Sequence, residues 1–242
     1  MSAGSTGLAC HANHLLRALK AESFRALEAH LQTVELHLGK VLYEPDEIVQ
    51  FAYFPHDAVI SLIAVLSSGK TMEVNTIGCE GIAGFVDSLG NCATTARYVV
   101  QFAGTASRIS IKYLQNEMET DAVLRGMLLS YLKASLAQTF QIGVCNAVHS
   151  MENRCGRLML TMRDRTGRDE LPLTHEFLAE MLGVNRPAVS IAMRHLQQAG
   201  FIRQGRGAIT ITDEVGLQGV SCECYNTIRR YYEQHVPDGT RA

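Results

Sequence analysis

Cationic and short polar side chains gather in the C-terminal third of this 242-residue sequence. Residues 150–212 carry nine arginines against six acids, a local charge of +3, whereas the whole chain carries −2. A guanidinium presents a planar fork of donors that fits phosphate oxygens and the O6 and N7 acceptors of guanine. These residue types therefore suit the recognition of a nucleic acid. The candidate contacts are Thr174, His175, Asn185, Arg186, Ser190, Arg194, Arg203 and Arg206.

Two short helices joined by a turn are predicted to position these side chains. Thr174 can cap the first helix, and Gly183 permits the positive φ of a tight turn after it. Asn185 then caps a second helix over residues 186–199, with Pro187 in the first turn, where a missing N–H costs nothing. The pattern indicates a helix-turn-helix. The residues expected to anchor the inner face of the second helix are Val189, Met193 and Leu196.

A β-hairpin is predicted directly after the second helix. Residues 201–203 and 208–211 form two apolar runs around a Gly-containing turn. Arg203 and Arg206 would then lie on a wing that meets phosphates. The alternative is a purely structural pair of hairpins with a solvated basic face; the order of elements, the caps and the local basicity favour a winged helix-turn-helix.

The region upstream of this motif changes pattern from helix to strand. Residues 13–32 predict a helix, because their leucines and Phe24 recur on one face. Short apolar or alternating runs with Gly, Pro, Asn and Asp between them then indicate a β-sandwich or barrel. The expected strands are residues 34–38, 58–65, 71–77, 96–101 and 106–111.

A long helix is predicted over residues 121–151, which contain no proline, and a further helix over residues 152–165. Spacings of three and four along the long helix match a coiled-coil seam, so we expect it to form a dimer interface. A helix buried within one chain would show the same pattern. The predicted seam is Leu124, Leu128, Tyr131, Ser135, Gln138 and Ile142.

The segment LTHEFLAEMLGVNRPAVS at residues 173–190 resembles the DNA-binding domain of the Crp/Fnr superfamily. Residues 53–55 (YFP) and 78–81 (GCEG), with Gly84, resemble the family's cyclic-nucleotide-binding-type barrel. The resemblance covers about residues 13–213 and implies an α+β fold, with an N-terminal jelly roll, a long dimerisation helix and a C-terminal winged helix-turn-helix. The implied divisions are 1–120 (sensory barrel), 121–150 (dimerisation helix), 151–213 (DNA-binding domain) and 214–242 (C-terminal helical extension).

The resemblance also assigns roles to the second helix and its neighbours. Arg186 is expected to contact a base edge, Ser190 a base or phosphate, and Arg194 a phosphate. Thr174 and His175 are expected at the DNA backbone. Many family members carry glutamate where this sequence has Pro187, and proline cannot accept a hydrogen bond from cytosine N4. The target sequence should therefore differ from that of the cyclic-AMP receptor.

The family's effector pocket holds the ribose with a glutamate and the cyclic phosphate with an arginine. The sequence keeps Glu80 and Gly81, but Thr94 and Thr95 stand where the Arg-Ser motif is expected. Arg97 follows shortly after, but a strand residue that is one position out of register points to the opposite face of the sheet. Cyclic-nucleotide binding is therefore not expected, and the effector stays open.

Seven cysteines are scattered along the chain, which argues against a disulfide framework. No Cys-x-x-Cys pair signals a zinc or iron–sulfur site. An Fnr-like cluster needs grouped N-terminal cysteines, and Cys10 stands alone there. Nine histidines leave haem sensing open. A disulfide between Cys222 and Cys224 would be strained, so their role stays undecided.

These observations favour a cytoplasmic, homodimeric, DNA-binding transcription regulator. No run approaches the ~20 apolar residues of a membrane span. No Gly-rich phosphate loop, His-Glu-x-x-His or Gly-x-Ser-x-Gly motif indicates an enzyme. The expected partners are double-stranded DNA and a second copy, with RNA polymerase and an unidentified small molecule as further candidates. The alternative is a sensory or interaction module whose DNA-binding domain is non-functional.

Overall fold

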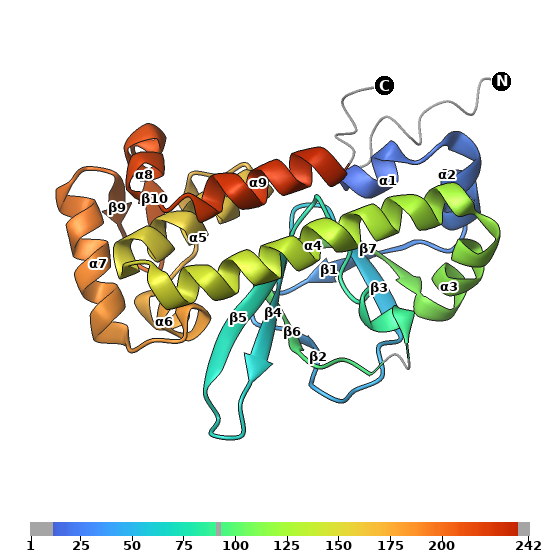
Figure 1. Ribbon diagram of the computed structural model, residues 1–242, viewed down its shortest axis with the longest axis horizontal. Coiled ribbons are helices and arrows are strands. Elements are labelled where there is room, and N and C mark those ends of the chain that lie inside the picture. Colours follow the sequence, from blue (N-terminus) through green and yellow to red (C-terminus); the bar gives the residue numbers. More distant parts are fainter. Residues whose placement is uncertain (1–11, 91–92, 237–242) are drawn as a thin grey trace.

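The N-terminal half of the chain is built on two antiparallel sheets that enclose one core (Figure 1). The computed structural model describes residues 12–90 and 93–236. One sheet has the order β1-β7-β3 and the other β2-β6-β4-β5. The strands are β1 (Gln32–Leu36), β2 (Val41–Tyr43), β3 (Phe51–Pro55), β4 (Val59–Val65), β5 (Thr71–Ile77), β6 (Arg97–Phe102) and β7 (Gly104–Ser110).

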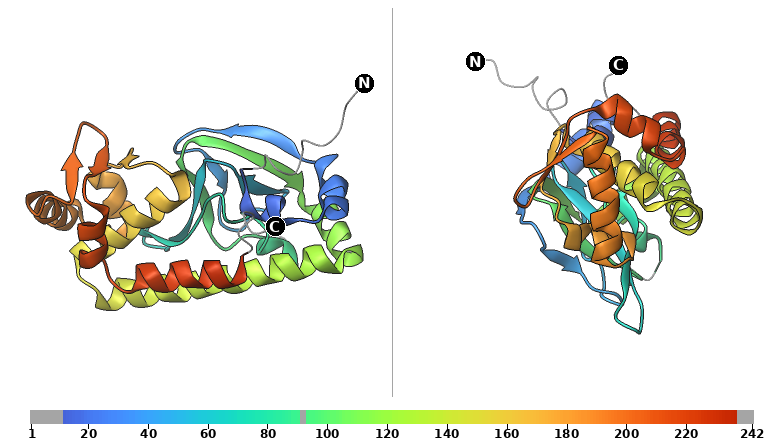
Figure 2. Two further views of the ribbon diagram at one scale, coloured as in Figure 1. Left: turned by 90° about the horizontal axis from the view of Figure 1, so that it is seen from above. Right: turned by 90° about the vertical axis from the view of Figure 1, so that its left-hand side faces the viewer.

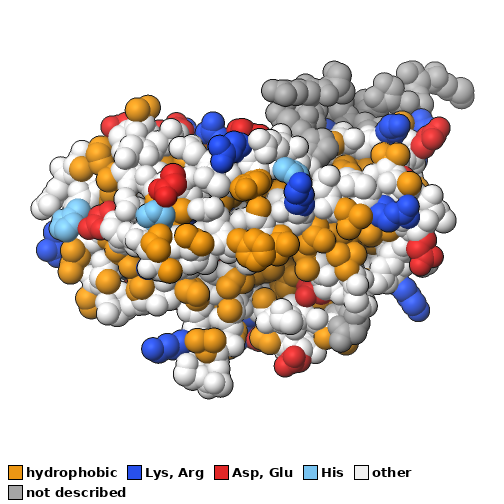
Figure 3. Space-filling view, viewed as in Figure 1, with side chains coloured by type: hydrophobic (Ala, Val, Ile, Leu, Met, Phe, Trp, Pro, Cys, Tyr) orange, Lys and Arg blue, Asp and Glu red, His pale blue; other side chains and the backbone are white. Residues whose placement is uncertain are grey.

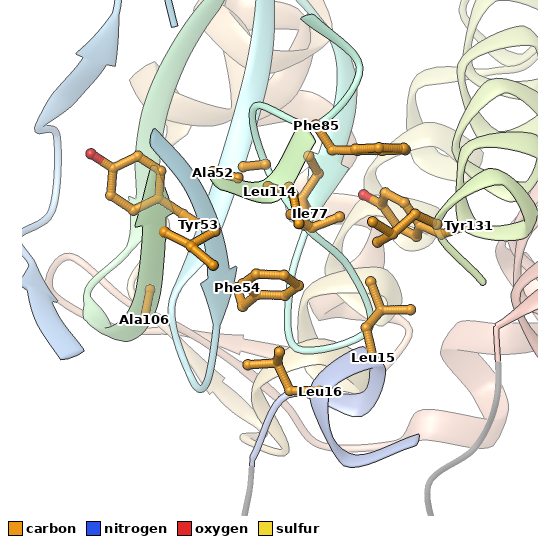
Figure 4. Close-up of a cluster of buried hydrophobic side chains, with 14 of the residues drawn as sticks. Leu15, Leu16, Ala52, Tyr53, Phe54, Ile77, Phe85, Ala106, Leu114 and Tyr131 are labelled. Carbon is orange, nitrogen blue, oxygen red and sulfur yellow. The ribbon is translucent and has the colours of Figure 1, made fainter. Parts of the chain in front are cut away.

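Large apolar side chains fill the space between these sheets, as Figure 4 shows. Phe54 and Phe85 are at most 1% exposed and share the core with Tyr131, which reaches in from a helix. A Cβ on Gly81 would lie 2.6 Å from Tyr131 Oη, so that helix packs directly on the glycine. The core therefore joins the β domain and the helix into one unit.

Two strands and one helix break differ from what the sequence pattern predicts. The runs at β2 and β3 were not expected as strands. The predicted helix over residues 13–32 is two helices, α1 (His14–Ala18) and α2 (Ala21–Glu28). The buried Asn13 caps α1 and donates to two backbone carbonyls of the β domain, Pro55 O and Gly81 O, which fixes α1 on that domain. Extended backbone at Leu19 then redirects the chain into α2.

The long helix α4 (Ala122–Val148) follows α3 (Ile111–Thr120) and runs most of the length of the molecule (Figure 1). All six residues of the predicted dimer seam are at most 5% exposed in the single chain, because α4 packs on α9, β5 and α3 of the same chain. The seam prediction is therefore wrong. The polar members are held by β5: Asn75 Nδ2 donates to Ser135 Oγ at 3.0 Å, and Gln138 Nε2 donates to Thr76 O at 3.2 Å.

The opposite side of α4 carries a row of apolar side chains in the open, here called the outer stripe. Its members are between 45% and 67% exposed, and Figure 3 shows apolar side chains gathered along the middle of this face. They recur at spacings of mostly four and seven along the helix. The outer stripe is Leu129, Leu136, Phe140, Val144 and Val148.

The C-terminal region forms a second core at the far end of α4 (Figure 1). Its three-stranded sheet has the order β8-β10-β9. Figure 2 shows its last helix running back alongside α4. The elements are α5 (Met151–Thr166), β8 (Glu170–Leu171), α6 (His175–Leu182), α7 (Arg186–Gln198), β9 (Ile202–Gln204), β10 (Ile209–Ile211), α8 (Glu214–Val220) and α9 (Cys224–His235).

The two cores are in contact with each other. Val59, Ile63 and Phe102 of the β domain belong to the C-terminal core. Arg165 of α5 forms a buried ion pair with Glu80 at 2.8 Å. Within the residues described, no helix is both long and apolar enough to cross a membrane.

Candidate nucleic-acid interface

The turn between α6 and α7 is fixed by local caps. Thr174 Oγ1 accepts from Phe177 N at 3.1 Å and begins α6. Gly183 ends the helix at φ 65°, a left-handed conformation that favours glycine, and Val184 N donates back to Ala179 O at 3.0 Å. Asn185 Oδ1 accepts from Ala188 N at 2.9 Å and begins α7. These contacts are the helix-turn-helix that the sequence predicts.

Helix α7 is buried on one face and open on the other. Val189, Ala192 and Met193 are fully buried against α5 and α6. The predicted DNA contacts Arg186 and Arg194 lie on the exposed side. In Figure 1 the helix lies at the end of the molecule farthest from α2 and α3. Its outward face is therefore accessible to a duplex.

Arg186 is the first residue of α7 and pairs with Glu176 on α6. Its Nε lies 2.8 Å from Glu176 Oε1, and both side chains are 63% exposed. An ion pair so open to water contributes at most about 1 kcal/mol. The guanidinium can therefore leave Glu176 for a base edge at small cost.

Four side chains link α6, α7 and the wing through hydrogen bonds. His175 Nδ1 lies 2.9 Å from Ser190 Oγ, and His175 Nε2 lies 2.7 Å from Gln204 Oε1. The backbone N–H of Gln204 donates to Gln197 Oε1 at 2.8 Å. His175 and Ser190 thus already hold the three elements together. Sequence reasoning did not identify Gln204, whose role appears only when β9 lies against α7.

The hairpin after α7 carries the two predicted wing cations. β9 and β10 pair antiparallel, with Arg203 opposite Thr210. Gly205 N donates to Ala208 O at 2.8 Å and closes the turn. Arg203 and Arg206 are both exposed, Arg206 within the turn itself.

Ile191 was not among the predicted contacts but lies on the same outward face of α7. Its side chain is 50% exposed, and it follows Ser190 directly. An apolar side chain at this place suits the methyl group of thymine. The sequence offers one signal for it: Ile191 is apolar but falls outside the spacing of Val189, Met193 and Leu196, which form the inner face of the helix.

Comparison with known proteins agrees with this geometry. Residues 153–220 match the Crp-like helix-turn-helix domain. The transcriptional regulator SdrP of Thermus thermophilus is 24% identical over 173 residues, which cover 69% of this chain and 82% of SdrP. The chain is therefore a transcriptional regulator with a Crp-like helix-turn-helix DNA-binding domain. Its α+β fold resembles that of Crp/Fnr regulators.

Solved structures show the same fold over most of this chain. FixK2 from Bradyrhizobium japonicum superposes with a TM-score of 0.69 at 14% identity, covering 79% of this chain and 98% of FixK2. A Crp/Fnr-family regulator from Eubacterium rectale gives 0.68 at 15% identity, covering 86% and 98%. At such identities the likeness concerns the fold alone.

The predicted effector residues of the regulator do not converge on one site. Glu80 is paired with Arg165, while Arg97 reaches outward to Glu44 at 2.8 Å. The Thr94 hydroxyl is buried and bonds to the backbone of Ala96. Thr95 is exposed, and Gly81 lies under Tyr131.

A cavity of about 250 Å³ lies instead between the β domain, α5 and α9. Glu80 and Arg165 stand at its wall, and apolar atoms of α9 supply much of the remainder. Burial raises the pKa of Asp164, which lines the same cavity and accepts from Tyr225 Oη at 2.9 Å. No sequence pattern indicates this cavity, because much of its wall comes from the C-terminal extension.

One further group of side chains comes together at the end of α4. Cys145, His149, Cys222 and Cys224 lie with their candidate ligand atoms all within 4.8 Å of one another. The signal present in the sequence is Cys-x-x-x-His at helical spacing together with Cys-x-Cys. Cys10 lies outside the described residues.

Proposed function

We propose that this regulator binds a palindromic DNA site as a homodimer, with α7 of each copy in the major groove. The observation that carries the proposal is the open face of α7, which begins at Arg186 and ends in the last turn beyond Arg194. A helix of this exposure fits a groove about 12 Å wide. Arg186 would then form a bidentate contact to guanine, while Asn185 caps the helix.

Contacts around α7 would position this helix on the DNA rather than specify the DNA sequence. Arg194, Arg203 and Arg206 would meet phosphates, and the N-terminus of α6 at Thr174 would face the DNA backbone. The hydrogen bonds of His175 to Ser190 and Gln204 support this, because they fix the wing relative to α7. Ser190 and His175 would contact DNA only while also keeping these hydrogen bonds within the protein.

The second copy would pack on the outer stripe of α4. Isolated exposed apolar residues are ordinary, but a continuous row along one helix marks an interaction surface. The row has the spacing of a helix–helix contact. Self-association through it would set the two α7 helices at a fixed separation, with half-sites about 10–10.5 bp apart.

The β domain would respond to something other than a cyclic nucleotide. Glu80 is already neutralised by Arg165, and no arginine occupies the phosphate position of Thr94. A small molecule in the cavity beside α9, or RNA polymerase as a protein partner, would bias the hinge at residues 149–151 and so shift the population of DNA-competent dimers.

Fluorescence anisotropy with duplex DNA from the gene's own upstream region tests this function. Arg186→Ala should weaken binding by 1–3 kcal/mol, about 5- to 150-fold, and relax specificity at one position per half-site. Arg230→Ala on α9 removes the same charge from an exposed position away from α7 and is the matched control. Equal loss in both variants, or wild-type protein that ignores DNA at low salt, would contradict the proposal.

A further inference from the structure

Three cysteines and one histidine from two distant parts of the chain meet beside the hinge between α4 and α5; we call them the Cys3His cluster. Cys145 and His149 lie one turn apart at the end of α4, and Cys222 and Cys224 lie where α8 passes into α9. The three thiols are buried and His149 is partly buried. Figure 2 shows α4 and α9 side by side where these segments meet.

The separations within the Cys3His cluster are those of a tetrahedral metal site. Cys145 Sγ lies 3.5 Å from Cys222 Sγ, and Cys224 Sγ lies 3.5 Å from His149 Nδ1. Bonds of about 2.3 Å to sulfur and 2.0–2.1 Å to nitrogen place tetrahedral ligands about 3.8 Å apart for two sulfurs and about 3.6 Å for sulfur and nitrogen. These two separations agree with such positions to within a few tenths of an ångström, and all four ligand atoms lie within 4.8 Å of one another.

Groups around the Cys3His cluster orient its ligands as outer-shell partners do in metal proteins. His149 Nε2 lies 3.3 Å from Glu223 Oε2, which leaves Nδ1 directed at the cysteines. Gln141 Nε2 donates to Cys224 Sγ at 3.1 Å. Arg157 of α5, only 3% exposed, places a positive charge close to the Cys145 thiol.

Two other roles for the Cys3His cluster fit the geometry less well. A disulfide between Cys145 and Cys222 would require their sulfurs to approach to about 2.05 Å and would leave His149 and Cys224 without a role. An iron–sulfur cluster binds its thiolates through separate irons, which spreads them beyond the 4.8 Å within which all four ligand atoms lie. A single ion uses all four side chains.

We propose that the Cys3His cluster is a mononuclear metal site and that its ion is Zn²⁺. Three thiolates and one imidazole are ligands that Zn²⁺ takes in closed structural sites. On binding, the thiols release their protons to solvent, and the site keeps a charge of −1 beside Arg157. The ion would tie the end of α4 to the start of α9 across the hinge, whether or not the protein binds DNA.

Metal analysis of the full-length protein tests the site directly. The protein should be purified without metal-affinity resin, in reducing buffer, and measured by mass spectrometry of the metal. We expect about one zinc per chain and an X-ray absorption first shell of about three sulfurs near 2.3 Å with one nitrogen near 2.0 Å. Protein without zinc that takes up none from micromolar ZnCl₂, or a Cys145–Cys222 disulfide trapped by anaerobic alkylation, would overturn the proposal.

Variants locate the ion. Cys222→Ser and His149→Ala should lose most of the zinc, whereas Cys155→Ala should keep it, because Cys155 is a buried thiol on α5 outside the Cys3His cluster. Should the ligand variants fail to fold, Glu223→Gln alters an exposed side chain and should weaken zinc 10- to 100-fold in chelator competition. Wild-type zinc affinity in Glu223→Gln and full zinc in Cys222→Ser would place the metal elsewhere.

Discussion

The DNA-binding domain and the β domain differ in the solvent exposure of their charged side chains. At α7 the cations stand in water and Arg186 is held by only one exposed carboxylate. In the β domain Glu80 is drawn into a buried pair with Arg165 of the DNA-binding domain itself. The surface that we propose reads DNA is thus open, while the carboxylate expected to bind an effector is part of the contact between the two domains.

The largest expected effect comes from breaking that contact. Glu80→Gln would leave the buried Arg165 guanidinium without its ion-pair partner. Removal of one partner of a buried pair costs roughly 3–5 kcal/mol of the free energy of unfolding. Urea unfolding of the full chain measures it. Asp57→Asn is the control, because Asp57 and Arg168 form a pair at 4.0 Å that is about half exposed and should contribute under about 1 kcal/mol. Equal costs would remove the contrast between the domains.

The next effect concerns the two faces of α4. Phe140→Asp on the outer stripe should yield monomers by analytical ultracentrifugation and weaken binding to a full palindrome by roughly 100-fold or more, since linked half-sites gain that much from avidity. The stability of the monomer should change little. Leu128→Ala on the inner face should instead lower the free energy of unfolding by roughly 2–5 kcal/mol. A dimer that survives Phe140→Asp would place the second copy on another surface.

Within the DNA-binding domain, the wing and α7 should differ in kind. Arg206→Ala should weaken all DNA sequences alike and reduce the salt slope by about 1, as loss of one phosphate contact does. Ile191→Ala should cost about 1 kcal/mol only where a thymine faces it. Anisotropy titrations at several salt concentrations, with matched and substituted duplexes, separate the two; a uniform loss in Ile191→Ala would contradict its assignment.

The smallest expected effect is that of cyclic AMP. Because Glu80 is neutralised and Thr94 cannot supply a charge-assisted phosphate contact, millimolar cyclic AMP should change neither DNA affinity nor melting temperature. Isothermal calorimetry on the full chain checks this. Measurable binding would mean that Arg165 can release Glu80, and the β domain would then be a sensor of the usual family chemistry.

The helix-turn-helix was predictable because its determinants are local. Thr174, Gly183 and Asn185 each act within four residues of their own position, so the sequence suffices to place them. Which face of α4 is exposed was not predictable from spacing. The same period describes a face covered by the protein's own sheet and one left for a partner. Only Asn75, far away in sequence, explains why Ser135 lies inside.

The Cys3His cluster shows the same limit. Cys145 and Cys222 are 77 positions apart, and the sequence contains nothing that requires α9 to return along α4. The cavity wall beside Arg165 depends on the same return. Long-range packing, rather than residue type, decided these features.

Binding-site selection from random duplexes, with wild-type protein and Arg186→Ala in parallel, tests whether Arg186 at the start of α7 contacts a guanine. We predict a palindrome with half-sites about 10–10.5 bp apart and an invariant guanine in each half-site that the variant no longer selects. No enriched sequence, or the same guanine enriched with both proteins, would contradict it.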